Sequence, residues 1–210
     1  MNKTVAEPLM GLALLLVVFF AARHLGMMEA ARAKSQAAAE REQKVVVIDS
    51  GHGGNDPGKI GVDESLEKDI NLSIAKKLKG YLESSDVKVV MTREEDKGLY
   101  RESDKKKKMA DMKKRCEIIA DARPDAVVSI HQNSYHQENV SGGQVFYYRN
   151  SVEGKRLAEL LQERFSYVLG EENTRQAKAN DSYYLLLHVK EPIVIVEQMA
   201  NRQTKNDHPK

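Results

Sequence analysis

The sequence from residue 45 to residue 54 reads VVVIDSGHGG, an apolar run followed by polar residues and glycines. An apolar run without polar interruption is typical of a strand covered on both faces. The pattern therefore predicts that His52 follows the carboxyl end of a buried strand. The glycines beside it let the backbone pass close to a metal or a substrate.

Further strands and helices alternate along the rest of the chain. The predicted elements are strands at 87–91, 126–130, 145–148 and 193–196, helices at 66–84, 100–122 and 152–169, a polar loop at 171–181 and a short helix or turn at 182–189. Alternation of this kind indicates an α/β fold. We therefore expect a single domain with a mixed, mostly parallel central sheet flanked by helices.

The spacing of apolar residues predicts which side of each helix faces the sheet. On the first helix Leu66, Ile70 and Ile74 recur every four residues, with Tyr81 expected on the same side and Lys68 in water. On the other two helices the residues expected to point inward are Met109, Met112, Cys116, Ile119, Leu157, Leu160, Leu161, Phe165 and Val168.

The charges of the chain nearly cancel, with 33 basic and 31 acidic residues and a net charge of +2. This balance gives no reason to expect nucleic acid as a partner. The run Lys105–Lys108 is interpreted as a solvated helix face, with a weak contact to an anionic polymer or a membrane as the alternative. Cys116 is the single cysteine, so it forms no intramolecular disulfide and is interpreted as a small, buried or half-buried helix residue.

The N-terminal part of the chain differs from the rest. Lys3 precedes an apolar stretch at 9–22, which is the arrangement of an export signal. Extended through residue 28, this stretch is long enough to span a bilayer. A small-x-small cleavage site at 31–33 lies well beyond the apolar core, so an uncleaved anchor is favoured over a cleaved signal peptide. The expected organisation is a signal anchor or signal peptide over 1–28, a spacer over 29–43, the folded domain over 44–197 and a polar tail over 198–210.

Four residues that can bind metals or move protons follow predicted strands or open a helix. His52, His131 and Glu197 lie at strand ends and Glu67 begins the first helix, with Glu64 as its rival. Each alone has a plain structural explanation, such as a loop or core histidine, a favourable helix dipole, or a surface carboxylate. Together they could converge on one edge of the sheet, since sites in such sheets lie beyond the strand ends. Two histidines and a carboxylate suit catalytic zinc, and a further carboxylate can transfer protons, so the set indicates a metal-dependent hydrolase.

The motifs around these residues resemble those of the zinc N-acetylmuramoyl-L-alanine amidases of the Amidase_3 type. The matching segments are DSGHGGNDPG at 49–58, Gly61, EKD at 67–69, SIHQN at 129–133 and IVE at 195–197. The resemblance covers about residues 44–197, the expected catalytic domain. The short chain with its N-terminal apolar segment is most similar to the CwlD-type amidases of spore formers, which act on cortex peptidoglycan.

The resemblance implies a role for each matching residue. His52, Glu67 and His131 would bind Zn²⁺, with Glu67 preferred over Glu64 because the family places its ligand in the Glu-Lys-Asp triplet. Glu197 would be the general base and then the general acid. Asp49 would be structural or would orient His52, and Asn133 would contact the substrate or hold its loop. The implied reaction is hydrolysis of the amide between N-acetylmuramic acid and L-alanine in peptidoglycan.

The C-terminal segment departs from the family pattern. The family continues after the glutamate with a closing helix, whereas residues 198–210 are polar and without an amphipathic stripe. We therefore consider a covering or activating protein partner, a domain that tolerates the loss, or a poorly active copy. The expected location is exported, membrane-anchored through the N-terminal helix or secreted, on the cell-wall or spore-envelope side of a bacterial membrane. Alternative functions are a zinc peptidase of the stem peptide and a non-catalytic peptidoglycan-binding or scaffolding protein.

Overall fold

The computed structural model describes residues 20, 22–34, 43–61, 63–133, 142–170 and 173–199. The chain divides into two units, residues 1–43 and residues 44–210. In the first unit, residues 22–34 are helical. None of the helices in the described ranges is both long enough and apolar enough to cross a bilayer. Most of the predicted anchor and the predicted tail beyond residue 199 lie outside the described residues, so both remain predictions.

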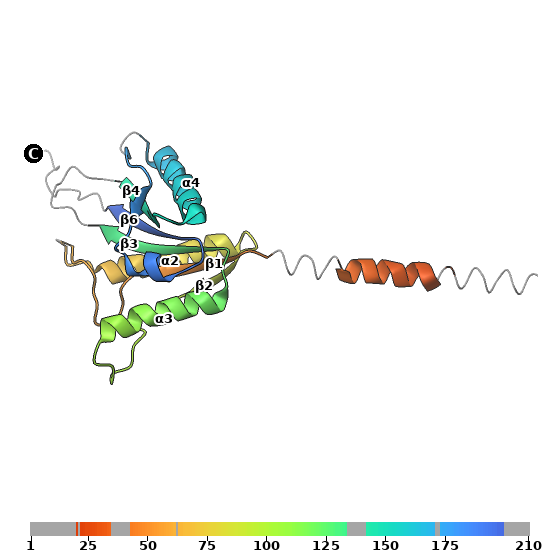
Figure 1. Ribbon diagram of the computed structural model, residues 1–210, viewed down its shortest axis with the longest axis horizontal. Helices are drawn as coiled ribbons and strands as arrows, with labels where there is room; N and C mark the ends of the chain where they lie inside the picture. The colour runs from red at the N-terminus through yellow and green to blue at the C-terminus, as the bar shows by residue number, and fades with distance from the viewer. Residues whose placement is uncertain are drawn as a thin grey trace, which may run out of the picture. The chain divides into compact units, whose positions relative to one another are not determined.

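The second unit is built on a six-stranded sheet with the order β2-β1-β3-β6-β4-β5. The strands are β1 (Val45–Ser50), β2 (Lys88–Met91), β3 (Ala126–Asn133), β4 (Gly142–Tyr148), β5 (Lys178–Asn180) and β6 (Ile193–Met199). Only β4 and β6 pair antiparallel, while the other neighbours in the order are parallel. The predicted mixed, mostly parallel sheet is therefore confirmed (Figure 1).

Helices cover both faces of this sheet. They are α2 (Glu67–Glu83), α3 (Lys107–Ala122), α4 (Val152–Leu169) and α5 (Tyr184–His188). Strand side chains alternate between the faces, so Val47 and Ile195 pack with α3 and α5 in one apolar cluster, whereas Ile48 packs with α2 and Val196 with α4. Because His131 and Glu197 follow the same alternation, they lie on the face that α3 and α5 cover.

Several sequence predictions are wrong in detail. Helix α3 begins at Lys107 instead of residue 100, and the predicted loop at 171–181 contains the short strand β5. Four side chains expected inside are exposed, namely Tyr81, Met109, Leu160 and Val168. Each of these helices has more apolar residues than positions that face the sheet, so some apolar side chains remain exposed to solvent. Small or polar residues such as Ala158 and Gln162 occupy the buried positions of α4.

Candidate metal centre

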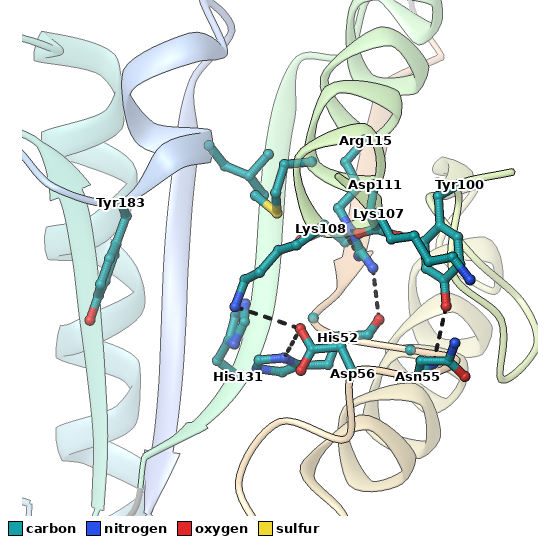
Figure 2. Close-up of a pocket in the computed structure, with 15 residues that line it drawn as sticks. His52, Asn55, Asp56, Tyr100, Lys107, Lys108, Asp111, Arg115, His131 and Tyr183 are labelled. Carbon is teal, nitrogen blue, oxygen red and sulfur yellow. Dashed lines mark hydrogen bonds and ion pairs between the residues drawn. The ribbon is translucent and has the colours of Figure 1, made fainter. Parts of the chain in front are cut away.

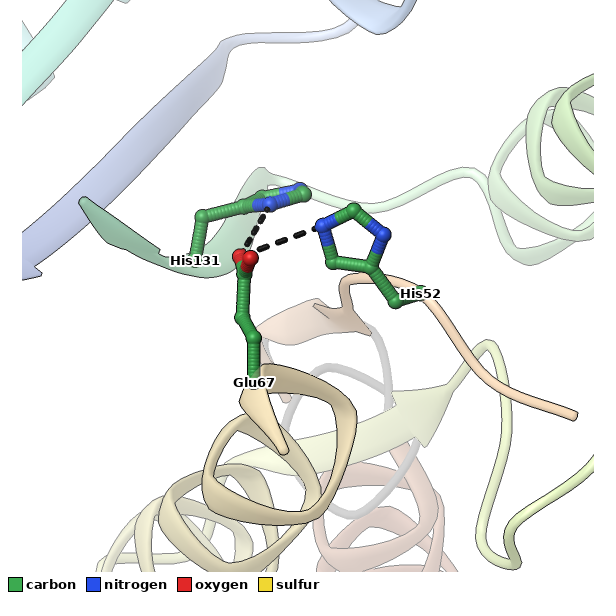
Figure 3. A group of neighbouring side chains, drawn as sticks. All are labelled: His52, Glu67 and His131. Carbon is green, nitrogen blue, oxygen red and sulfur yellow. Dashed lines mark hydrogen bonds and ion pairs between the residues drawn. The ribbon is translucent and has the colours of Figure 1, made fainter. Parts of the chain in front are cut away.

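Three of the predicted site residues meet at one edge of the sheet. His52 follows β1, His131 lies near the end of β3, and Glu67 is the first residue of α2. Strands β1 and β3 run parallel, so their carboxyl ends reach the same edge. Potential ligand atoms of the three side chains all lie within 4.8 Å of one another (Figure 3).

The distances inside this cluster test whether it fits a metal ion. Two ligands about 2.1 Å from a tetrahedral zinc ion lie about 3.4 Å apart. Glu67 Oε1 lies 3.1 Å from His52 Nε2 and 3.0 Å from His131 Nδ1. Figure 3 shows both imidazole rings turned toward the one carboxylate. A small outward movement of the three side chains would give the separations that a metal ion of this size requires.

The environment keeps the Glu67 carboxylate charged. Its side chain is only 3% exposed, and this burial alone would raise its pKa. Hydrogen bonds from His131 and His52, and from the backbone N–H groups of Lys59 and Gln132, outweigh burial and lower the pKa well below its usual range. Burial alone would lower the pKa of His52, but contacts with Glu67 and Asp56 raise it. Metal binding to such a set displaces protons, so it is expected to strengthen as pH rises.

Two glycines make room for the cluster. Gly58 has a φ of +68°, and a Cβ there would lie 2.6 Å from Glu67 Oε2 and 2.7 Å from His52 Cδ2. A Cβ on Gly51 would collide with the His131 ring. His52 itself has a φ of 62°, a conformation that non-glycine residues adopt only when the surroundings enforce it. The glycine-rich motif is therefore a steric requirement of this site.

Two buried arginines enforce the path of that loop. Arg115 on α3 donates hydrogen bonds to the carbonyl oxygens of Ser50 (2.8 Å) and His52 (2.7 Å). Arg93, just after β2, donates to the carbonyl oxygens of Ser50 and Gly51, both at 3.0 Å. Charged donors make strong hydrogen bonds. The loop that presents His52 is thus held on two sides.

Asp49 also helps to hold the His52 loop, through its ion pair with Arg115. Its carboxylate accepts hydrogen bonds from Arg115 (2.7 Å), Ser129 (2.6 Å) and Thr92 (2.8 Å). Burial would raise the pKa of Asp49, but the charge of Arg115 and these hydrogen bonds lower it to about 2. Asp49 accepts a hydrogen bond from Arg115, which in turn donates one to the backbone carbonyl of His52. Asp49 would therefore orient His52 by holding the backbone of its loop, without contact with the imidazole ring.

Besides Glu67, the carboxylate of Asp56 contacts the His52 ring, a contact that no sequence pattern predicted. Asp56 Oδ2 lies 3.0 Å from His52 Nδ1, the ring nitrogen opposite the one that faces Glu67. A carboxylate at this position fixes the orientation and tautomer of a metal-binding imidazole. The available signal was its place four residues after His52 in the glycine-rich motif.

Glu197, the predicted proton-transfer residue, faces the same cavity. It pairs with His131 in the register of β3 and β6. A cavity of about 500 Å³ is lined by His52, Glu67, His131, Glu197 and Tyr183, among others. The Tyr183 hydroxyl donates a 2.6 Å hydrogen bond to Glu197 Oε1. Tyr183 precedes α5, and no spacing pattern connects it with Glu197.

The other residues for which the sequence predicted a place or a role lie outside the metal cluster. Glu64 is exposed in the turn before α2 and is not part of the cluster. The backbone of Asn133 ends β3, but its side chain lies outside the described residues. Lys68, expected in water, is largely covered and donates to the Gly54 carbonyl oxygen and to Asp96. Cys116 is half-buried, and burial raises the pKa of its thiol, which disfavours a nucleophilic role.

Known proteins share this sequence and fold. Residues 46–207 match the Amidase_3 family, described as N-acetylmuramoyl-L-alanine amidase. The germination-specific N-acetylmuramoyl-L-alanine amidase of Bacillus subtilis is 34% identical over 157 residues, which are 73% of this chain and 65% of that protein. N-acetylmuramoyl-L-alanine amidase LytC of the same species is 30% identical over 156 residues, 73% of this chain and 29% of that protein. The chain thus spans less than two thirds of the length of either relative.

Among solved structures, the CwlD amidase from Clostridioides difficile, in complex with the GerS lipoprotein, has a TM-score of 0.71 and 38% sequence identity. The match covers 74% of this chain and 82% of that one. The predicted resemblance to CwlD-type amidases is therefore confirmed. With a family match over most of its folded part, this chain belongs to the Amidase_3 family of N-acetylmuramoyl-L-alanine amidases.

Proposed function

We propose that this protein is a zinc-dependent hydrolase that cleaves the amide between N-acetylmuramic acid and L-alanine in peptidoglycan, with a role in maturation or germination of the spore cortex. The observation that carries the proposal is the His52, Glu67 and His131 cluster, which shares one cavity with Glu197. The relatives named as N-acetylmuramoyl-L-alanine amidases, one of them germination-specific, support the reaction and the setting.

In the proposed mechanism His52, Glu67 and His131 would hold Zn²⁺. Zinc at such a site would lower the pKa of a bound water and polarise a carbonyl group. Glu197 Oε2 or Oε1 accepts the proton of the attacking water and then delivers it to the departing nitrogen of L-alanine. The Tyr183 hydroxyl, bonded to Glu197 Oε1, keeps this carboxylate in place. Asp49 and Arg115 hold the His52 loop, and Asn133 contacts the substrate.

The proposal includes location and partners. An exported protein, anchored by its N-terminal apolar segment or secreted, would meet peptidoglycan on the cell-wall or spore-envelope side of the membrane. The structural relative CwlD was solved in complex with a lipoprotein. We propose that this chain also binds a protein partner that supports its activity.

The experiment is digestion of purified peptidoglycan by the full-length protein, with zinc or with a chelator. We expect new L-alanine amino termini and free lactyl carboxylates, both abolished by the chelator. New amino termini without lactyl carboxylates would identify a stem-peptide peptidase instead. Binding without any cleavage by the folded, zinc-loaded protein would favour a non-catalytic binding role.

Asp56→Asn is expected to weaken zinc binding by about 10- to 100-fold. The amide keeps the size of the side chain but loses the charge that lies 3.0 Å from His52 Nδ1. Competition with a chromophoric chelator measures the dissociation constant. The matched control is Asp63→Asn in the neighbouring exposed turn, which should leave zinc affinity unchanged. Equal affinities for Asp56→Asn and the wild type would show that Asp56 does not support the site.

A further inference from the structure

The lysine run at the start of α3 lies where a helix least favours positive charge. Helix α3 begins at Lys107, has no side-chain hydrogen bond at its N-cap Lys106, and has no acidic residue in its first turn. The positive end of the helix dipole stabilises carboxylates in the first turn and disfavours cations there. The stability of α3 therefore does not account for Lys105–Lys108.

The four lysines of this run differ in where their side chains lie. Lys105 and Lys106 are exposed. Lys107 Nζ donates a 2.6 Å hydrogen bond to Glu102 Oε2 and lies over the ring of Tyr100. Lys108 alone among them lines both described cavities at the metal centre. In Figure 2 its side chain extends from α3 toward His131 and Asp56.

The Lys108 ammonium group forms a long ion pair with Asp56 and is otherwise exposed. Its Nζ lies 3.8 Å from Asp56 Oδ2, which is longer than a hydrogen bond. The side chain is 82% exposed, and its flexible stem lets the charge move by several ångströms. Asp56 Oδ2 also contacts His52 Nδ1. The positive charge therefore lies one contact away from a proposed zinc ligand.

The second cavity, of about 590 Å³, extends from the metal centre along α3 and α5. Met112, Tyr183 and Leu185 contribute its apolar wall, and Lys108 lines both this cavity and the one at the metal centre. A peptide that continues beyond a cleaved bond at the metal advances by about 3.5 Å per residue. A charged group on the second residue would thus come within reach of Lys108.

We propose that Lys108 binds the free α-carboxylate on the second residue of the stem peptide, a γ-linked glutamate next to the L-alanine. This inference rests on the proposed function, since it places the bond to L-alanine at the metal centre. It makes Lys108 a specificity-determining residue. The protein then prefers peptidoglycan with a free carboxylate at this position over peptidoglycan in which that carboxylate is amidated.

The test measures binding of two small ligands to the full-length protein. They are N-acetylmuramoyl-L-alanyl-D-glutamate and its amide, N-acetylmuramoyl-L-alanyl-D-isoglutamine. Each is titrated into zinc-loaded protein that carries Glu197→Gln, which slows cleavage, and wild type here means this protein with Lys108 intact. We expect the wild type to bind the acid up to about fivefold more tightly, which is the size of a solvent-exposed charge pair. High salt should reduce the difference.

Lys108→Gln should remove the preference for the acid, with a larger loss of binding for the acid than for the amide. The matched control Lys105→Gln removes the same charge from the same run, outside the cavities, and should keep the preference. Equal binding of acid and amide by the wild type, or a preference that survives in Lys108→Gln, would overturn the inference. Peptidoglycan hydrolysis is followed separately with zinc, so a failed amidase assay counts against the proposed function and leaves the binding result intact.

Discussion

Glu197→Gln is expected to lower the rate of amide hydrolysis by about 10²- to 10⁴-fold, the usual contribution of a general acid–base group. Glutamine has nearly the shape of glutamate but cannot accept the proton of the attacking water. Its amide oxygen can still accept the hydrogen bond that the Tyr183 hydroxyl donates to Glu197 Oε1 at 2.6 Å. The substitution therefore removes the proton acceptor and preserves its surroundings.

Zinc binding should be unaffected, because the described cluster of potential ligands consists of His52, Glu67 and His131. The measurements are kcat on a soluble muropeptide and zinc content after dialysis. Glu163→Gln, an exposed position on α4, is the matched control and should retain full activity. If Glu197→Gln kept more than a tenth of the wild-type kcat with zinc bound, another group would have to carry the proton.

The sequence predicted those parts of the fold that depend on local pattern. The apolar run of β1 and the runs in β3 and β6 are long enough to identify buried strands. Strand β5 has only three residues, Lys178–Asn180, and pairs with β4 through its backbone, so its side chains carry no strand pattern. Helix α3 was predicted too long because the charged residues before Lys107 are good helix formers, whereas in the structure they form turns.

The sequence predicts the site residues that belong to short motifs. It does not predict the residues that reach the site only through tertiary contacts. His52, Glu67, His131 and Glu197 lie in short motifs at strand ends or at a helix start. Tyr183 reaches the site only because α5 packs beside β6, which no local spacing reveals. Arg115 contacts Asp49 across 66 residues of sequence, and no local pattern separates it from the exposed lysines of the same helix.

Arg115→Met is expected to reduce the free energy of unfolding by about 3–5 kcal/mol, the typical result of removing one partner of a buried ion pair. Arg115 is 2% exposed, and its Nη1 lies 2.7 Å from Asp49 Oδ1. Methionine keeps much of the apolar volume but leaves Asp49 charged and buried. It also removes the donors to the Ser50 and His52 carbonyl oxygens.

Chemical denaturation of both proteins measures the difference in free energy of unfolding, and the melting temperature should fall by roughly 6–20 °C for a domain of this size. The matched control is Lys114→Met, the neighbouring residue on α3, whose exposed pair with Glu117 should contribute little. The zinc affinity of Arg115→Met should also fall, because the His52 loop loses one of its two arginine supports. A variant as stable as the wild type would show that the Asp49 charge is compensated elsewhere.

The pH dependence distinguishes loss of charge pairing from loss of packing. In the wild type the pKa of Asp49 is lowered from 3.8 to about 2. Its contribution to stability is therefore present above about pH 4 and is lost as pH falls toward 2. In Arg115→Met the charge of Arg115 no longer opposes burial, so the pKa of Asp49 rises. The cost of burying the Asp49 charge then decreases as the pH falls and the carboxyl becomes protonated. The stability difference between the two proteins should consequently narrow as pH falls from 7 to about 4, whereas a packing defect would leave it constant.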